Sequence, residues 1–521
     1  MALRSLNRRA TSRLSRRELI ATRRTCLRRA STPKVSAVAA TASAADGRNR
    51  ASGLGSLTFL DYVVPFTAPL AAAVATGAYT GALGAGLAWP LRAALVGAGP
   101  LLVHLLLPGL DWLLGPSRAL ADRQAQAQQA EQALKAPPAD DFLSRLLPCL
   151  AAATHLLVLF LAYGTLAAAE APAVPQAPPP AEPQQLLLLP LLVTSLALSA
   201  GMAQAASHEL LHSRHPVHQA VAWLHLTTHW WYPYFRAHHQ HHLTVCTPVD
   251  YASAPRGLSL AVYVRRYLRG SYVEAWQLAA AECKRAGKPV FSIHNSCLVA
   301  LAAQAALAAG LALALGPAMA LLHAAVCATF LTYMAVLDYV LHYGLQRPPL
   351  AAATAGGGGG GSATANAGAE AAAGSAGAAA GTGEAAQPVA TAPVPAVPVP
   401  APGASGPVRY APVTPFNSWS SLYPFENALF FNVLIHADHH MAASRSYAWL
   451  VPTPSTPTFP GPINALGLAA FVPPLWRATM DERADRANRA NLQHLAALGA
   501  PVAAEAVEAG PGKPAAASRA A

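Results

Sequence analysis

The sequence predicts an all-α, multi-pass membrane protein: a bundle of about six transmembrane helices with a histidine-rich metal site on one membrane face. Hydrophobic residues make up 53% of the 521 residues and charged residues only 12%. The mean hydropathy is +0.30. Apolar segments of about 20 residues, the length that crosses a bilayer, recur along the chain. Groups of histidines stand at or just beyond the ends of several of these segments.

We expect the transmembrane helices near residues 60–88, 91–115, 146–168, 185–206, 296–316 and 318–341. The first two segments contain prolines that remove helical hydrogen bonds, namely Pro65, Pro69, Pro100 and Pro108. Kinks are therefore expected in both of these segments.

Four histidine groups carry the chemistry of this chain. They lie at residues 208–212 (HELLH), 238–242 (HHQHH), 342–345 (HYGL) and 436–440 (HADHH). Histidines at positions i and i+4 share one helix face, so the two of the first group can reach the same point. Neutral imidazole suits iron, copper, nickel and zinc, and this many imidazoles exceed the needs of one tetrahedral zinc. The pattern predicts two metal ions in the membrane protein.

The strongest candidate ligands are His241, His242, His439 and His440, followed by His342. From the second group either His238 or His239 adds one more imidazole. Metal-bound histidines commonly donate their second ring N–H to a carboxylate, and four nearby acids are expected to orient them in this way: Glu209, Asp250, Asp338 and Asp438. The isolated histidines are expected to be structural: His104, His155, His225, His229, His294, His323 and His494.

The order of the groups along the chain predicts their sidedness. Two membrane crossings separate the second group from the third, so all four groups fall on the same face. The loop between the fourth and fifth segments is rich in Lys and Arg, which indicates that this face looks to the stroma or matrix.

Two other interpretations of the histidines fit the sequence less well than a site with two metal ions. The HELLH motif is typical of zinc peptidases, with Glu209 as the general base, but one zinc would leave most of the clustered histidines unexplained. A metal transporter without catalysis would hold its ligands near the bilayer midplane rather than at helix ends. Attack on an unactivated C–H bond needs an oxidising metal, and two irons beside an apolar interior meet that need.

Several segments lie outside the predicted membrane domain. Residues 1–45 have the basic, acid-poor composition of an organelle transit peptide, for a plastid or alternatively a mitochondrion. Residues 348–411 are a low-complexity insertion that is expected to be disordered, as is the tail 495–521. The membrane domain therefore comprises residues 58–345 and 412–485.

The charge and the cysteines restrict the partners. Residues 1–50 carry 13 Lys and Arg against 2 acids, which accounts for most of the net charge of +12 and excludes a nucleic-acid face. The six cysteines include no CxxC pair, so a fused rubredoxin-type centre is not expected. An electron donor would have to be a separate protein.

The motifs resemble those of the integral-membrane alkane 1-monooxygenases, non-haem di-iron hydroxylases of the fatty-acid-desaturase-like superfamily. The resemblance runs from about residue 58 to 485 and rests on residues 207–212, 241–253, 338–345 and 418–447. It implies two iron ions, O₂, a rubredoxin- or ferredoxin-like donor and an alkane or fatty-acyl substrate. It also implies nine ligands, of which eight carry over by position: His208, His212, His241, His242, His342, His436, His439 and His440. The ninth comes from the second group, where we take His238, with His239 as the alternative.

Two positions depart from the alkane monooxygenase pattern. The family has its first histidine of the second group four residues before the pair, where this chain has Ala237, and His238 instead produces the HxxHH spacing of acyl desaturases. The family's Glu before HYG is replaced by Leu341. An acyl-lipid desaturase with the same di-iron site is therefore the alternative to a monooxygenase.

Overall fold

The computed structural model describes residues 57–84, 86–118, 120–122, 145–170, 183–351 and 408–502. The predicted transit peptide, most of the insertion and most of the tail lie outside these residues. Within them the fold is all-α, with isolated β-bridges and no extended strand. This confirms the predicted fold class.

Five helical segments in the described residues are long and apolar enough to cross a membrane. The first joins α3 (Phe59–Val63) to α4 (Thr67–Thr80) through a 3-10 turn, and the others lie in α9 (Leu146–Glu170), α10 (Pro183–Leu211), α14 (Ser296–Leu315) and α15 (Pro317–His342). The first segment ends eight residues before the predicted boundary at 88. In contrast, α10 and α15 extend past their predicted ends, so that His208 and His342 are part of the helices.

A sixth segment is bent rather than straight. It consists of α5 (Trp89–Val96), α6 (Ala98–Leu101), a π-helical turn (Leu102–Leu106) and α7 (Leu107–Leu114), with an angle of 71° between its two parts. The bend follows Gly97, and the π-helical turn lies between Pro100 and Pro108, each of which removes a backbone donor. The kinks predicted for this segment are therefore present.

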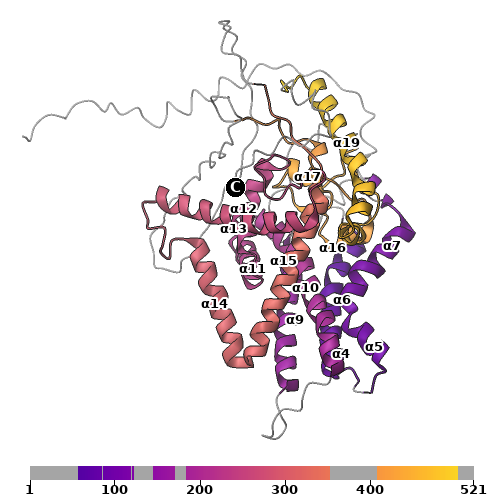
Figure 1. Ribbon diagram of the computed structural model, residues 1–521, viewed down its shortest axis with the longest axis vertical. Coiled ribbons are helices and arrows are strands. Elements are labelled where there is room, and N and C mark those ends of the chain that lie inside the picture. Colours follow the sequence, from indigo (N-terminus) through magenta and orange to yellow (C-terminus); the bar gives the residue numbers. More distant parts are fainter. Residues whose placement is uncertain are drawn as a thin grey trace, which may run out of the picture. The chain divides into compact units, whose positions relative to one another are not determined.

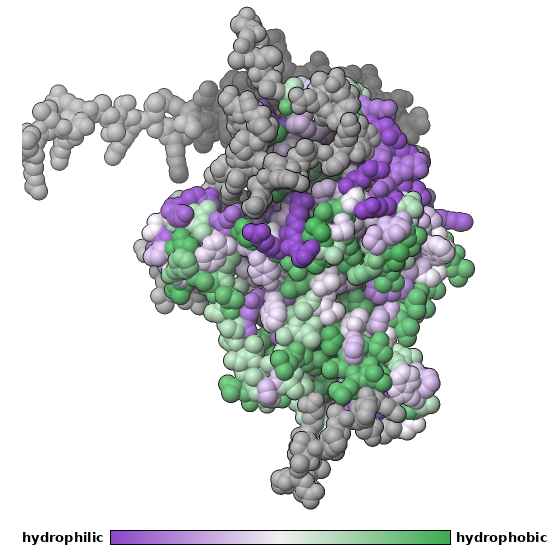
Figure 2. Space-filling view, in the orientation of Figure 1, coloured by the Kyte–Doolittle hydropathy of each residue, from purple (hydrophilic) through white to green (hydrophobic). Residues whose placement is uncertain are grey.

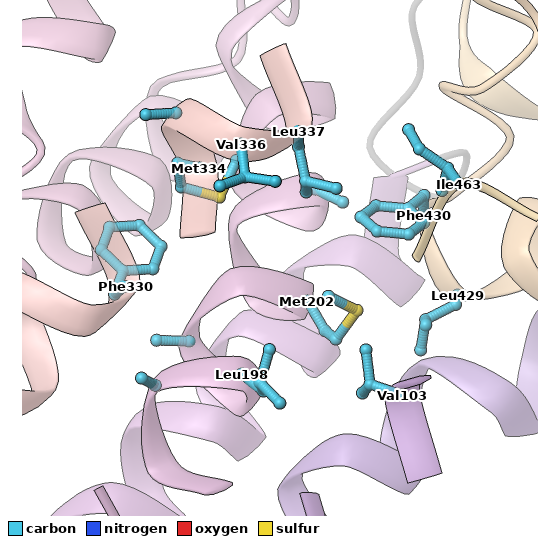
Figure 3. Close-up of a cluster of buried hydrophobic side chains, with 14 of the residues drawn as sticks. Val103, Leu198, Met202, Phe330, Met334, Val336, Leu337, Leu429, Phe430 and Ile463 are labelled. Carbon is cyan, nitrogen blue, oxygen red and sulfur yellow. The ribbon is translucent and has the colours of Figure 1, made fainter. Parts of the chain in front are cut away.

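The core of the bundle lies around α10, which packs against α4, α9, α11 and α15 (Figure 1). Leu198 and Met202 of α10 and Phe330 and Met334 of α15 belong to its buried apolar cluster (Figure 3). Both helices continue from this cluster into histidine groups. Apolar packing thereby determines where these histidines lie.

The outer surface of the spanning helices is apolar. Figure 2 shows hydrophobic side chains over the part of the molecule where α14, α9 and α4 lie, and hydrophilic ones over α13 (Leu260–Arg285) and α19 (Pro473–Ala497). Only 11% of the apolar window of α14 is buried, and its Leu313 is 88% exposed. An apolar surface of this extent on a helix of 20 residues is typical of a membrane span in contact with lipid.

Shorter helices pack around the spanning helices. They are α11 (Pro216–Thr228), α12 (Tyr232–Thr244), α16 (Pro424–Leu429), α17 (His436–Met441) and α18 (Ile463–Ala469). The segment after the insertion contacts the first part of the domain, since α16 packs on α7 and α18 on α15. Helix α19 continues to Ala497, so the first residues of the predicted tail are helical.

The two ends of the insertion lie side by side. Pro349 and Tyr410 form an antiparallel bridge. The Leu350 amide donates to the carbonyl of Arg409 at 2.7 Å, and the Ala411 amide donates to the carbonyl of Pro348 at 2.9 Å. The chain therefore leaves and re-enters the domain at one point.

Deleting residues 352–405 is expected to leave activity and iron content within about twofold of the full chain. The remaining residues, Ala351 and 406–408, form a connection of hairpin-loop length between Leu350 and Arg409. Iron analysis and product yield of the purified deletion variant would check this. Replacement of the same residues by a Gly/Ser repeat of equal length is the control, and loss of activity in both variants would show that the insertion has a function.

Gly344→Ala is expected to lower the free energy of unfolding by about 2–4 kcal/mol. Gly344 has a φ of +75°, which costs other residues roughly 1–2 kcal/mol, and an added Cβ would lie 2.6 Å from the Cβ of Ala484. Thermal unfolding in detergent measures the loss. Gly164→Ala in α9 is the control, because a Cβ there meets nothing within 4 Å; equal stability of the two variants would contradict the prediction.

Candidate metal centre

Three helix C-termini and one short helix converge at the hydrophilic end of the bundle (Figure 1). Helix α10 ends with the first histidine group, α12 carries the second in its last two turns, and α15 ends at His342. Helix α17 consists almost entirely of the fourth group. The C-terminal ends of helices carry partial negative charge, which favours a cation at this point.

Five histidines form one cluster, which we call the five-histidine cluster: His208, His212, His238, His242 and His439. A chain of close contacts joins their Nε2 atoms, with 3.3 Å between His208 and His212, 3.1 Å between His212 and His238, 3.0 Å between His238 and His242, and 3.2 Å between His242 and His439. Three separate elements, α10, α12 and α17, contribute to this cluster.

Four more histidines form the four-histidine cluster: His241, His342, His436 and His440. The Nε2 of His436 lies 3.2 Å from that of His342 and 3.1 Å from that of His440. The ring centroids of His242 and His440 are 4.4 Å apart, so the two clusters are in direct contact. The structure thus brings together all nine histidines of the expected ligand set, in two adjacent groups.

The nitrogen arrangement fits metal ions better than a network of hydrogen bonds. A single Nε2 cannot both carry a proton and offer a lone pair, so an unbroken chain of Nε2 contacts cannot be satisfied by N–H···N bonds. Two nitrogens that bind one ion at about 2.1 Å and at right angles are about 3.0 Å apart, which matches the contacts in both clusters. The nine residues therefore fit a site for metal ions.

Burial keeps most of these rings neutral and ready to bind a metal. It lowers the pKa of His238, His242, His439 and His440 well below the ordinary value, and that of His436 to about 3. Imidazoles bind metals through the lone pair of the neutral ring, so this environment favours ligation over protonation.

Asp250 is the carboxylate that lies against one of the expected ligand histidines, His241. Its oxygens are 3.0 and 3.1 Å from the Nδ1 of His241, and it also accepts from the Ser253 hydroxyl and the Ala252 amide. Burial acts to lower the pKa of His241, but the carboxylate outweighs it and raises that pKa. With its Nδ1 donating to Asp250, neutral His241 presents the lone pair of Nε2 to the cluster.

The other three acids expected to orient histidines have different partners. Asp438 forms a salt bridge with Arg445 and accepts from the Val451 amide at 2.9 Å. Asp338 accepts from the Tyr267 hydroxyl. Glu209 forms a buried salt bridge with Arg145, with 2.8 Å between Oε1 and Nε, so its charge is already matched. That pairing disfavours the zinc-peptidase interpretation, in which Glu209 would be a free general base.

The position of the second histidine group distinguishes His238 from His239. His238 is buried and contributes its Nε2 to the five-histidine cluster, whereas the side chain of His239 is exposed. Because α12 repeats every 3.6 residues, His238 shares a face with both His241 and His242, whereas His239 lies on nearly the opposite side from His241. The three histidines with the HxxHH spacing are thus the ones on the inward face of α12.

Three histidines that seemed isolated in the sequence also converge. His155 of α9, His225 of α11 and His229 at the end of α11 offer ring nitrogens within 4.8 Å of one another. The spacing of His225 and His229 by four residues was the available signal, but it needed a helix at 216–228 that the apolar pattern did not predict. Of the others, His104 lies against the carbonyl of Asn464, and His294 is exposed.

The sequence of the chain is similar to those of known proteins. Residues 184–453 match the family model of the fatty acid desaturases, described as "Fatty acid desaturase". The match begins in α10 and includes all four histidine groups.

Several curated alkane 1-monooxygenases also align with the chain. Alkane 1-monooxygenase 2 of Pseudomonas aeruginosa is 27% identical over 293 residues, which cover 55% of this chain and 63% of the relative. Alkane 1-monooxygenase 1 of the same organism is 24% identical over 293 residues, 55% of this chain and 62% of the relative. Alkane 1-monooxygenase 1 of Alcanivorax borkumensis is 26% identical over 308 residues, 56% of this chain and 59% of the relative. The chain thus spans less than two thirds of the length of each of these relatives.

Proposed function

The chain belongs to the fatty acid desaturase family, and from this premise we propose that it is a membrane di-iron monooxygenase that hydroxylates the alkyl chain of an alkane or fatty-acyl substrate. The observation that carries the proposal is the convergence of nine histidines in two contacting clusters at one end of a membrane helix bundle. The alkane 1-monooxygenase relatives support the hydroxylation chemistry.

The metal centre is proposed to hold two irons. His208, His212, His238, His242 and His439 would bind one, and His241, His342, His436 and His440 the other. Paired iron supplies the redox capacity to activate O₂ for insertion into a C–H bond. The protein orients His241 through Asp250 and keeps the surrounding imidazoles neutral by burial.

The residues that precede the histidines on α10 and α15 are apolar, which supports a hydrophobic substrate. Met202 is six residues before His208 on α10, and Leu337 is five residues before His342 on α15. Both belong to the apolar cluster of Figure 3. An alkyl chain that enters along these helices would stay in apolar surroundings until its last carbons meet the imidazoles, and water would be excluded from that path.

Electrons are proposed to come from a separate rubredoxin- or ferredoxin-like protein. The cysteines in the described residues are free and scattered, and such a donor would dock at the hydrophilic end near α12 and α17. The basic residues 1–45 support targeting to an organelle membrane, that of a plastid before that of a mitochondrion.

Analysis of products tests the reaction. Membranes that contain the expressed protein would be supplied with an alkane or a fatty-acyl lipid, O₂ and a reduced rubredoxin or ferredoxin, and the products analysed by mass spectrometry. A 1-alkanol or an ω-hydroxy acid is expected. Membranes that contain His439→Ala are the control, and substrate that remains unchanged in the active preparation would refute the proposal.

An acyl-lipid desaturase is the second candidate, and one observation favours it. The histidines of α12 that belong to the two clusters are His238, His241 and His242, which have the HxxHH spacing of acyl desaturases. The same product analysis distinguishes the two reactions. A new double bond in the acyl chain, without a hydroxylated product, would replace the monooxygenase assignment by a desaturase.

A further inference from the structure

The cluster of His155, His225 and His229 is separate from the metal centre and has the features of a ligand set. The three side chains are at most 1% exposed. The Nε2 atoms of His155 and His229 are 3.1 Å apart, and the ring centroid of His225 lies 4.7 Å from that of His229 and 5.4 Å from that of His155. We call these residues the α9–α11 histidine cluster.

Each ring of the α9–α11 histidine cluster is held by its other nitrogen. The Nδ1 of His155 lies 2.8 Å from the Ser199 hydroxyl, and the Nδ1 of His225 lies 2.9 Å from the Ser207 hydroxyl. The Nδ1 of His229 lies 2.9 Å from the carbonyl oxygen of His225. Anchoring of the second nitrogen is how proteins orient metal-bound histidines, and here ring nitrogens of the three residues lie within 4.8 Å of one another.

The positions of the protons on the three imidazole rings also indicate a metal site. A carbonyl oxygen only accepts, so the Nδ1 of His229 carries the proton and its Nε2 presents a lone pair. A hydrogen bond from His155 to His229 would satisfy those two rings. It would leave the Nε2 of His225 buried without a hydrogen bond of normal geometry among the described residues, although the backbone of Ala200 on α10 lies close to that ring. A cation among the three nitrogens would satisfy all of them.

The surroundings favour a cation as well. Helix α11 has 13 residues and ends at Thr228, so His225 and His229 lie at its C-terminal end, where the backbone carbonyls carry partial negative charge. We propose that the α9–α11 histidine cluster binds a single Zn²⁺ ion that links α9 to α11 beside α10. Three imidazoles with a fourth position left for water are a common zinc ligand set, and they bind Zn²⁺ more tightly than Fe²⁺ in the usual order of affinities.

The test measures metal content, which does not depend on turnover. The purified full chain is equilibrated with Zn²⁺ in competition with a chelator, and zinc and iron per chain are measured by mass spectrometry. His155→Asn is expected to remove one zinc equivalent and to leave iron unchanged. His104→Asn, a histidine of the bent segment that lies against the Asn464 carbonyl, is the matched control and should keep both metals.

A second variant keeps all three imidazoles and covers the case in which His155→Asn fails to fold. Ser199→Ala removes only the partner of the His155 Nδ1 and is expected to weaken zinc binding by about 10–100-fold. Zinc binding that Ser199→Ala leaves unchanged would overturn the proposal, as would a full chain that takes up no zinc at this cluster. Neither result would bear on the nine-histidine centre, because iron is measured separately.

Discussion

His242→Ala is expected to abolish turnover and to lower the iron content of the purified protein. The Nε2 of His242 lies 3.0 Å from that of His238 and 3.2 Å from that of His439, so it stands in the middle of the five-histidine cluster. Loss of a group that only orients a ligand costs about 10–100-fold in metal affinity or activity, and loss of the ligand itself should cost at least 100-fold. Iron analysis and product yield measure the two effects, and His439→Ala should behave in the same way.

His294→Ala is the control for these variants. His294 is an exposed histidine just before α14, so its removal should change neither iron nor activity. Full iron and full turnover in His242→Ala would mean that the ligand set is wrong. Iron loss with retained folding, measured by the elution profile in detergent, would support the assignment.

Asp250→Asn is expected to lower iron affinity by about 10–100-fold while the protein still folds. An amide can present its NH₂ group to the Nδ1 of His241, which would reverse the proton on the ring and place N–H rather than the lone pair on Nε2. The buried carboxylate also accepts from Ser253 and Ala252, so Asn keeps the shape but loses the charge. Competition with an iron chelator measures the affinity.

The control for Asp250→Asn is Glu482→Gln on α19, where the carboxylate side chain is 79% exposed and pairs with Arg486. Neutralising an exposed carboxylate is expected to leave iron binding unchanged, since surface ion pairs contribute little. Equal iron affinity in Asp250→Asn and Glu482→Gln would contradict the role assigned to Asp250.

The sequence by itself determined the fold class and the convergence of the histidine groups at one end of the helix bundle. Both follow from local properties. The length and apolarity of residues 296–316 and 318–341 are enough to predict spanning helices, whatever these segments pack against. Two such helices between the second and third groups bring those groups to one face. The i, i+4 spacing of His208 and His212 likewise indicated a shared ligand site.

Only the tertiary structure decided which carboxylate meets which ring and which histidines meet one another. Glu209 and Asp250 are both close in sequence to expected ligand histidines, yet Glu209 pairs with Arg145, which lies 64 residues earlier, and Asp250 contacts His241, nine residues before it. His155 meets His229 across 74 residues, and no local pattern encodes that contact. Such pairings depend on how helices pack, and packing is determined by the side chains of the whole bundle rather than by any one segment.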